Sequence, residues 1–489
     1  MALAFVFCAL GAGTAAASPV LVMNHDGRVH RANDRALPPA STDPTSVLAN
    51  ASAVAVRPRA TLASAEKTVR SELNVLATKR AITGSQRTSY RSAFDSAVTT
   101  AKRLSGTRRT ELQAVIDTLH DIAASGQLTA SRLPALFETL ARNRQWWTTG
   151  KLMSYGQRVE FSGSQIVWEY YPGQGIQIQV LGTFGKANGY WSAGDRNDLS
   201  ALLREMLPMA VMRGKALTWE YYFTFDGGVP PWTSAMSQGT AIQALSRASQ
   251  LLDDPDYLAD ARRALPLFQQ APPSGVRVPS GSGGAMRYLQ YTFAPHEYIL
   301  NAFLQSLVGL YDYGTIADDQ TAMKLFNAGD KQAQRDVMTD DTGAWTLYDN
   351  GGLEADLSYQ ELINGFVANL CTRTRDDVYC DASRRWAGYL RTPPVVTLLT
   401  KNVKAGSKAN VSFRLSKQSK VGMTIAFAGK TYLSTSATVG YGTHFYTWSV
   451  PKTAPRGTYT VTLSATDQAG NFGRSAGTVN VAGKGKPAT

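Results

Sequence analysis

Apolar residues recur with different periods along the chain, and the changes of period divide it into regions. Between residues 62 and 145 they repeat at helical spacing, as in ELQAVIDTLHDIAASGQ and SRLPALFETLARNRQWW. This spacing places apolar side chains on one helix face and predicts antiparallel helices with a structural role. From Met153, QRVEFSGSQIVWEYYPGQGIQIQVLGTFGKANGYW alternates apolar and polar residues around Gly and Pro, which is typical of short strands and turns.

Between Asp198 and Leu390 amphipathic helices return, separated by aromatic, glycine-rich loops. Their spacing favours helical hairpins packed in a ring, an α/α toroid whose loops converge at one mouth. From about Thr392, alternating strands broken by turn residues predict an immunoglobulin-like β-sandwich. The predicted fold class is therefore multidomain and mainly α, with a small β segment before the toroid and the sandwich after it.

The first residues, MALAFVFCALGAGTAAASPV, predict a signal peptide that is cleaved near Ala17, and hence a secreted or cell-surface product. No later stretch is long and apolar enough to predict a membrane span. The predicted boundaries are 1–17 signal peptide, 18–61 extended flexible segment, 62–150 helical region, 151–197 short β-rich segment, 198–392 toroid, 393–483 sandwich and 484–489 tail.

Cysteine usage agrees with export. Once Cys8 leaves with the signal peptide, Cys371 and Cys380 remain, and one cysteine pair in an exported protein predicts one disulfide. The two cysteines and five histidines have no zinc-site spacing, so a zinc centre is disfavoured.

The net charge of +13 is unevenly distributed along the chain. Residues 151–394 carry 20 basic and 26 acidic side chains, whereas residues 395–489 carry 12 basic and 1 acidic. The basicity therefore does not predict an anion site in the central region, and no nucleic-acid partner is expected. The basic C-terminal module favours contact with a cell-wall polymer or an acidic polysaccharide, with a spacing or solubilising role as the alternative.

Several catalytic motifs are absent from the sequence, namely the G-x-S-x-G elbow, HExxH, the Walker loop and the Rossmann glycine fingerprint. The corresponding hydrolase, metalloprotease and nucleotide functions therefore lack their residues. Carboxylates near predicted loops remain, and two of them could form an inverting glycosidase site, although each alone is more often a helix cap or a solvated charge. These carboxylates are Glu220, Asp226, Glu297, Asp349, Glu354, Asp356 and Glu361.

A series of motifs in the central region resembles a known family. In order, the motifs are YYPGQGIQIQVLGTFGKANGYW, PPWTSAMSQGTAIQALSRA, YLADARRALPLF, YLQYTFAPHEYILNAFLQSLVGLYDYG, LYDNGG and LSYQELI. Over about residues 153–392 they resemble the C-terminal catalytic domain of D-glucuronyl C5-epimerases, in a bacterial-type secreted chain with an added immunoglobulin-like module.

This resemblance implies a helical toroid that inverts carbon five of D-glucuronic acid to L-iduronic acid within a polysaccharide such as a heparan sulfate-like glycan. It also implies tyrosines as proton-transfer groups. The family's first catalytic tyrosine falls on Tyr291, and the tyrosine of its short YD motif falls on Tyr348. A third falls on Tyr359, or on Ser358 if the last helix is aligned one position earlier.

Two departures from the family pattern bear on the substrate. Gln290 stands where the family has a glutamate before the first tyrosine, so an acid or base is missing there. The arginine that follows the YD motif in animal members is replaced by the region of Gly351. Recognition of the substrate carboxylate then falls to Arg287 or Lys186, or the substrate differs.

The chemistry of tyrosine suits the implied reaction. A proton next to a carboxylate is weakly acidic, so inversion needs one group to remove it and another to return a proton to the opposite face. A phenol, whose ordinary pKa is near 10, can serve as a strong base or a neutral acid. Gln290 and Asn350 are candidates to stabilise the carbanion by hydrogen bonding.

Aromatic side chains also stack on apolar faces of sugar rings, so Trp219, Tyr222 and Trp232 are candidates for a chain-binding groove, with burial in the core as the alternative. The same applies to the other aromatic residues of these loops, Trp168, Tyr170, Tyr171 and Tyr221.

Three function classes are thus open: an epimerase, a polysaccharide lyase that eliminates at carbon four after the same proton removal, and a non-catalytic glycan-binding protein. Proton transfer needs no redox or nucleotide cofactor, and the resemblance allows a structural calcium ion without assigning its ligands. The oligomeric state is not predicted.

Overall fold

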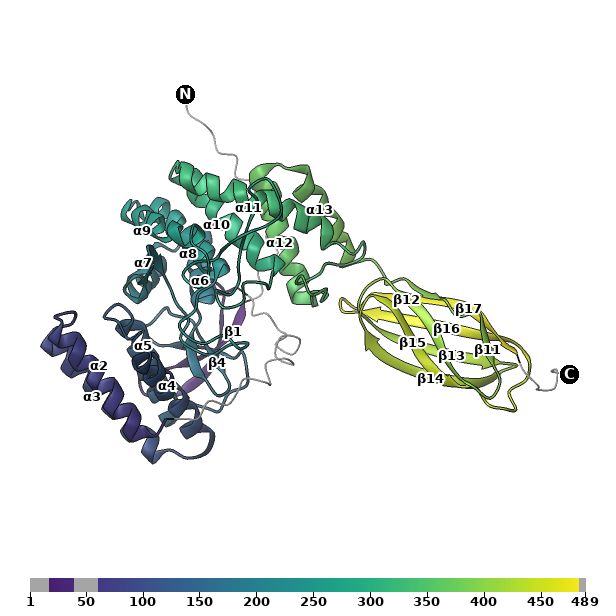
Figure 1. Cartoon of the computed structure of the whole chain (residues 1–489), viewed down its shortest axis with the longest axis horizontal. Helices are drawn as coiled ribbons and strands as arrows, with labels where there is room; N and C mark the ends of the chain where they lie inside the picture. Colours follow the sequence, from purple (N-terminus) through teal and green to yellow (C-terminus); the bar gives the residue numbers. More distant parts are fainter. Residues whose placement is uncertain (1–16, 39–59, 483–489) are drawn as a thin grey trace, which may run out of the picture. The chain divides into compact units, whose positions relative to one another are not determined.

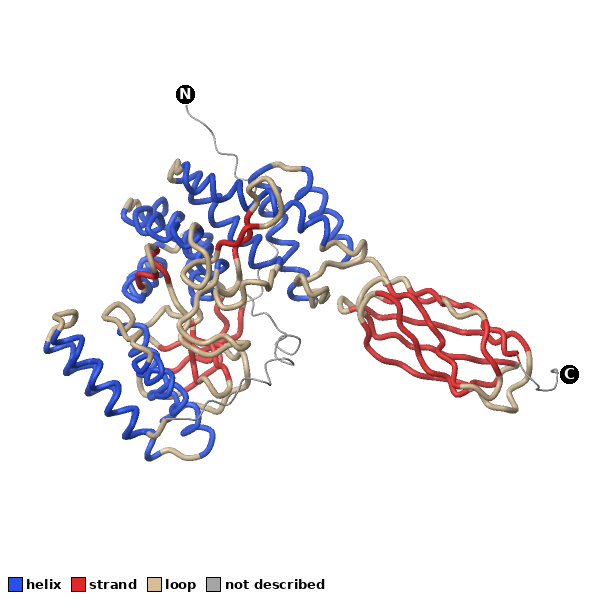
Figure 2. Tube along the Cα trace, in the orientation of Figure 1, coloured by secondary structure: helices blue, strands red, loops and turns tan. Residues whose placement is uncertain are grey.

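The computed structural model describes residues 17–38 and 60–482. Figures 1 and 2 show the whole chain, which divides into two compact units that are described separately below. The first unit comprises Met1–His296 and Gln305–Gly329, and the second comprises Glu297–Leu304 and Asp330–Thr489.

Four helices form the N-terminal part of the first unit. They are α2 (Leu62–Thr78), α3 (Gly84–Arg103), α4 (Gly106–Ala124) and α5 (Leu133–Thr149). Local sequence defines where they begin, because Thr61 caps α2 and Thr83 forms a reciprocal capping box with Gln86 at the start of α3. Their apolar faces pack together, with Val69, Phe94 and Ile116 fully buried.

The first unit also contains a five-stranded sheet in the order β2-β1-β3-β4-β5, and strands are drawn red in Figure 2. Its strands are β1 (Ser18–Met23), β2 (Val29–Asp34), β3 (Arg158–Phe161), β4 (Trp168–Tyr171) and β5 (Gly175–Ile178). β1 pairs antiparallel with β2 and parallel with β3.

The prediction of a flexible segment over 18–61 is therefore wrong for residues 18–34. Val20 and Met23 of β1 are buried against this sheet, and the pairing with β3 bridges more than a hundred residues of sequence. Local patterning could not reveal that partner. Residues 39–59 of the predicted segment, and residues 1–16 of the predicted signal peptide, lie outside the described residues.

Residues 180–193 form helix α6 (Val180–Ala193), where the sequence predicted strands and turns. The glycines that suggested turns serve helix packing instead. A Cβ at Gly189 would overlap the carbonyl oxygen of Ala36, so the helix approaches the segment after β2 at backbone distance. The tertiary contact therefore accounts for a residue that is unfavourable to helices.

The remaining helices and strands of this region surround the predicted functional loops. They are α7 (Arg196–Met206), η1 (Leu207–Met209), β6 (Val211–Arg213), β7 (Ala216–Thr218), α8 (Ala235–Leu252), α9 (Asp256–Ala264), η2 (Leu265–Phe268), β8 (Arg277–Pro279), β9 (Met286–Tyr288), α10 (Leu300–Ile316) and α11 (Gln320–Thr339). Helices α8 and α10 cross closely, because a Cβ at Gly239 would lie 2.7 Å from Cα of Ser306.

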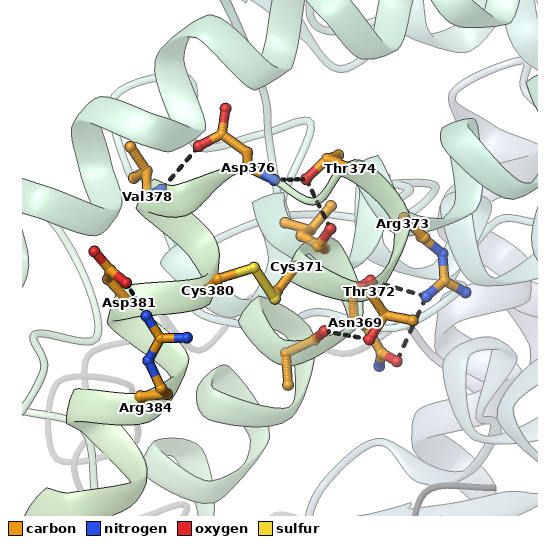
Figure 3. Close-up of a disulfide and its surroundings, with 12 residues drawn as sticks. Asn369, Cys371, Thr372, Arg373, Thr374, Asp376, Val378, Cys380, Asp381 and Arg384 are labelled. Carbon is orange, nitrogen blue, oxygen red and sulfur yellow. Dashed lines mark hydrogen bonds and ion pairs between the residues drawn. A yellow bond between two sulfur atoms is a disulfide. The ribbon is translucent and has the colours of Figure 1, made fainter. Parts of the chain in front are cut away.

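The second unit contains a helical hairpin, α12 (Leu357–Thr374) and α13 (Asp377–Tyr389). Figure 3 shows the disulfide that joins them, between Cys371 and Cys380, so the predicted pairing is confirmed. The turn between the helices is short, because Arg375 takes a left-handed conformation and the Asp376 carboxylate accepts the amide of Val378 to begin α13.

The C-terminal part of this unit is built from two sheets, β10-β12-β15 and β11-β17-β16-β13-β14. The strands are β10 (Val396–Leu398), β11 (Asn402–Lys404), β12 (Lys408–Leu415), β13 (Ser419–Phe427), β14 (Lys430–Val439), β15 (Gly442–Ser449), β16 (Gly457–Asp467) and β17 (Phe472–Ala482). One apolar core, which includes Phe413, Trp448 and Tyr459, joins the two sheets, and we refer to this part as the sandwich.

The described chain is thus mixed, with twelve α-helices and several sheets, rather than mainly α. The toroid and the immunoglobulin-like assignment stay predictions. Within the described residues, no helix has the length and apolar character needed to cross a membrane.

Candidate functional site

Tyr291 lies in an aromatic cluster of the first unit, formed by Tyr221, Phe223, Phe225, Trp232, Tyr291 and Phe293. Its ring stacks on Phe293 with centroids 5.1 Å apart and meets the edge of Trp232 at 5.7 Å. Trp232 stacks in turn on Tyr221 at 4.3 Å. These contacts, in which Tyr291 is only 7% exposed, hold its ring in one orientation.

The backbone beside Tyr291 is fixed by the segment that leads into α8. Thr292 and Thr233 exchange hydrogen bonds, since the amide of Thr292 donates to the Thr233 carbonyl and the Thr233 amide donates to Oγ1 of Thr292. Gln290 is half-buried, and its Oε1 accepts a hydrogen bond from Oγ of Ser234 at 3.0 Å. Gln290 therefore occupies the position beside Tyr291 with a defined side-chain orientation.

Asp226 adds a carboxylate next to this cluster. It sits in the tight turn between Phe225 and Gly228, with a φ of 43° that is uncommon for a residue other than glycine. Burial raises the pKa of its carboxyl group above the ordinary value. Asp226 is one of the carboxylates named from the sequence, and its neighbour Phe225 contacts Tyr291. The sequence did not predict this contact.

Tyr348 and Tyr359 come together in the second unit, with ring centroids 4.6 Å apart and planes at 51°. Tyr348 lies on a hairpin over residues 345–356, here called the tyrosine hairpin, in which its amide donates to the Leu353 carbonyl at 2.6 Å. Its own carbonyl accepts from the amide of Leu300 at 3.1 Å. The two tyrosines, which are eleven positions apart in the printed sequence, are thus brought into ring contact.

Tyr359 belongs to the first turn of α12. The Asp356 side chain caps this helix by accepting the amide of Tyr359 at 2.8 Å. Ser358, the alternative position for the third tyrosine, lies in the same turn. The structure thus brings Tyr348 and Tyr359 together, whereas Tyr291 belongs to the other compact unit.

Lys186 was predicted as a candidate for binding the substrate carboxylate, and the structure contradicts this. Its Nζ is buried between Asp34, at 2.9 Å, and Glu160, at 2.7 Å. Although burial opposes the charged form, these two carboxylates hold the pKa of Lys186 above its ordinary value. The ammonium group is therefore committed to an internal ion pair that connects β2, β3 and α6.

Trp219 and Tyr222 are also core residues rather than parts of an open groove. Trp219 is 1% exposed, and its indole donates to the Met206 carbonyl at 2.7 Å. Tyr222 donates to Glu220, and burial raises its pKa well above the ordinary value. Glu220 is itself paired with Arg132 and Arg213, so this carboxylate, too, has a structural role.

The other three candidates, Arg287, Asn350 and Trp232, have different surroundings. Arg287 is half-buried on β9, where its guanidinium donates to Oγ of Ser280 at 2.9 Å. Asn350 lies at the tip of the tyrosine hairpin, and its Oδ1 accepts the amide of Tyr298. Trp232 touches Tyr291 directly but is buried at 4% exposure, so it shapes the cluster rather than a sugar-stacking surface.

Three candidate carboxylates of the second unit bind backbone amides. Asp349 accepts from Gly351, Asp356 caps α12, and Glu354 accepts from two amides of the sandwich. Over residues 17–38 and 60–482, no three His, Cys, Asp or Glu side chains gather as metal ligands would.

Comparisons with known proteins agree with the motifs. Residues 213–388 match the family model described as D-glucuronyl C5-epimerase C-terminus. A D-glucuronyl C5-epimerase of Caenorhabditis elegans is 32% identical over 180 residues, which cover 33% of this chain and 29% of that protein. An uncharacterized protein of Methanocaldococcus jannaschii is 24% identical over 183 residues, covering 35% of this chain and 57% of that protein.

Among solved structures, an endo-beta-1,4-glucanase of Acetobacter xylinum aligns with 47% of this chain and 75% of its own, at 14% identity and a TM-score of 0.35. A TM-score this low does not establish a shared fold. The chain spans 29% and 57% of the lengths of the two curated relatives. Within these limits, the comparisons agree with the resemblance seen in the sequence: residues 213–388 match the model of the D-glucuronyl C5-epimerase C-terminus.

Proposed function

We propose that this protein is an isomerase that epimerises carbon five of D-glucuronic acid residues, to L-iduronic acid, within an acidic polysaccharide. The observation that carries the proposal is the family match over residues 213–388, which includes all three predicted tyrosines. The contact between the rings of Tyr348 and Tyr359 supports a paired role for these two phenols.

In the proposed reaction, one tyrosine, as phenolate, takes the proton from carbon five and becomes a phenol. The electron pair left behind delocalises into the carboxylate of the sugar. A second tyrosine then delivers its phenolic proton to the opposite face and becomes a phenolate, so carbon five loses one proton and gains one, and no carbon–oxygen bond of the sugar breaks. Tyr291, Tyr348 and Tyr359 are the proposed proton-transfer groups.

The doubly charged intermediate requires hydrogen-bond donors or cations near the sugar carboxylate. Arg287 supplies a guanidinium three positions before Gln290 and four before Tyr291. With Lys186 excluded by its internal ion pair, Arg287 and Gln290 are the proposed contacts to the carboxylate. A lyase would use the same first step but would expel the substituent at carbon four.

We also propose that the sandwich contacts the polyanion. Asp467 is the single acidic residue between positions 395 and 489, and it is buried in an ion pair with Lys417. The outer face of sheet β10-β12-β15 presents Phe445, 55% exposed, across from Ser412 and near Arg414. An exposed ring among hydroxyl groups and a cation suits a sugar chain that carries carboxylates.

The function is tested by incubating the full chain with de-N-sulfated, glucuronate-rich polysaccharide in heavy water. NMR follows deuterium at carbon five and the appearance of iduronate, and ultraviolet absorbance reports an unsaturated uronate. Iduronate that carries deuterium, without absorbance, is expected. Growing absorbance would assign a lyase, and binding without either product would assign a glycan-binding protein.

A further inference from the structure

The sandwich contacts the segment that carries two of the proposed catalytic tyrosines. Three of its loops, between β12 and β13, between β14 and β15, and between β16 and β17, lie at the same end of the two sheets. Each of these loops donates or accepts a hydrogen bond to the tyrosine hairpin or to the first turn of α12. A module that only spaces or solubilises would not require such contacts.

Glu354 forms the first of these connections. It is on the return arm of the tyrosine hairpin, where it pairs with Leu347, the residue before Tyr348. Its Oε1 accepts the amide of Gln418 at 2.9 Å and its Oε2 accepts the amide of Tyr441 at 2.6 Å. One buried carboxylate thus connects two sandwich loops to the strand opposite Tyr348.

Gln468 forms the second connection, at the helix that carries Tyr359. Its Oε1 accepts the amide of Leu357, the first residue of α12, at 2.9 Å. That amide has no acceptor within the helix, so a sandwich side chain completes the cap that Asp356 begins. The Gln468 amide nitrogen also reaches Oε1 of Gln418, which links the two connections.

Lys417 holds the sandwich against the end of α13 and the start of the tyrosine hairpin. Its buried Nζ contacts Asp467 at 2.6 Å and the carbonyls of Tyr389 and Thr392 at 2.7 and 2.6 Å. It also lies 5.0 Å from the ring centre of Trp345, at the start of the tyrosine hairpin. A fully satisfied buried cation defines a single register between the sandwich and the helical part of this unit.

We propose that the sandwich is a positioning part of the active site, which holds the tyrosine hairpin through Glu354 and the start of α12 through Gln468. This inference rests on the proposed function, because it gives Tyr348 and Tyr359 their role in proton transfer. Neither Glu354 nor Gln468 needs to touch the sugar. Both act on the backbone from which the tyrosines extend.

The test uses the full chain with Glu354→Gln, which replaces one acceptor oxygen by a donor facing an amide, and separately with Gln468→Leu. Glu72→Gln on α2 is the matched control, because it makes the same carboxylate-to-amide change far along the chain. Amide hydrogen exchange by mass spectrometry over residues 346–360 is the primary measurement, beside kcat and KM for deuterium incorporation at carbon five.

Glu354→Gln and Gln468→Leu are each expected to speed amide exchange in residues 346–360 by about tenfold, because each removes a hydrogen bond to a charged or capping group. The sandwich strands and the control should keep their protection, and kcat should fall more than KM rises. Unchanged exchange in 346–360, or an equal loss of protection throughout the sandwich strands, would overturn the proposal.

A wild-type protein that is inactive on every uronate glycan would remove the proposed function. The hydrogen-exchange comparison needs no substrate, so it would still support or overturn the connection between the sandwich and the tyrosine hairpin.

Discussion

At the scale of single residues, the structure separates candidate side chains that lie together from those that are paired inside the fold. Tyr348 and Tyr359 meet ring to ring, whereas Lys186, which looked equally polar in the sequence, is neutralised by Asp34 and Glu160. A sequence pattern shows that a lysine is present but not which carboxylates it will find in space. The tyrosines could be named because a family motif located them.

The choice between Tyr359 and Ser358 can be tested by substitution. Tyr359→Phe should reduce deuterium incorporation at carbon five by about a hundredfold or more, since proton transfer by a positioned side chain contributes that much. Ser358→Ala, in the same turn, should leave the rate within about twofold, because on this assignment its hydroxyl transfers no proton. The reverse order of effects would place the third group on Ser358.

A pH dependence is predicted at Asp341. Burial opposes ionisation of this carboxyl group, but hydrogen bonds from Trp386, Gly343 and Arg385 outweigh it and hold the pKa below the ordinary value. A lowered pKa means that the stabilisation is present above about pH 4 and is lost as the pH falls through the folded-state value.

Asp341→Asn should therefore lower the free energy of unfolding by about 2 kcal/mol at pH 7, and the difference from wild type should shrink below pH 4. Chemical denaturation measures this difference in the free energy of unfolding, and hydrogen exchange in α13 shows whether the loss of stability reaches that helix. Asp381→Asn, which removes an exposed pair with Arg384, is the control. A difference that stays constant between pH 7 and pH 3 would contradict the assignment.

At the scale of elements, the sequence predicted what depends on local periodicity and missed what depends on distant partners. Helices α8, α12 and α13 follow their apolar spacing, and the disulfide joins the expected cysteines. Helix α6 was missed because one of its glycines, Gly189, packs against the backbone of Ala36. Strand β1 was missed because its partner β3 lies far away in sequence.

Close packing of α8 against α10 gives a prediction at this scale. A Cβ at Gly309 would overlap the carbonyl oxygen of Gly239, so Gly309→Ala should destabilise the first unit by about 2 kcal/mol. Gly365→Ala in α12 is the matched control, because a Cβ there meets nothing within 4 Å. The control should be neutral or stabilise by up to about 1 kcal/mol. Equal melting shifts for both variants would refute this packing.

At the scale of the whole molecule, charge and contacts give the sandwich two proposed roles, one toward the glycan and one toward the tyrosine hairpin. The sequence revealed the first, because composition alone shows 12 basic residues against 1 acidic residue after position 394. It could not reveal the second, since the partners of Glu354 lie 64 and 87 positions away.

The glycan role predicts salt-dependent binding. The affinity of the full chain for a glucuronate-rich polysaccharide should fall about tenfold or more between 50 and 200 mM salt, because surface charges are screened over about 10 Å at 0.1 M ionic strength. Phe445→Ala should weaken binding without changing how steeply the affinity falls with salt. Arg414→Gln should reduce this salt dependence. Titration calorimetry measures both. Identical binding by wild type and both variants would argue against this face.

The central claim is that a tyrosine exchanges the proton at carbon five of a uronate within a polysaccharide. It is tested most directly by the rate of deuterium incorporation at that carbon, compared between wild type and Tyr291→Phe, with Tyr90→Phe on α3 as the control. The account predicts incorporation by wild type and the control, and a rate at least about a hundredfold lower in Tyr291→Phe. Equal rates in all three proteins would contradict it.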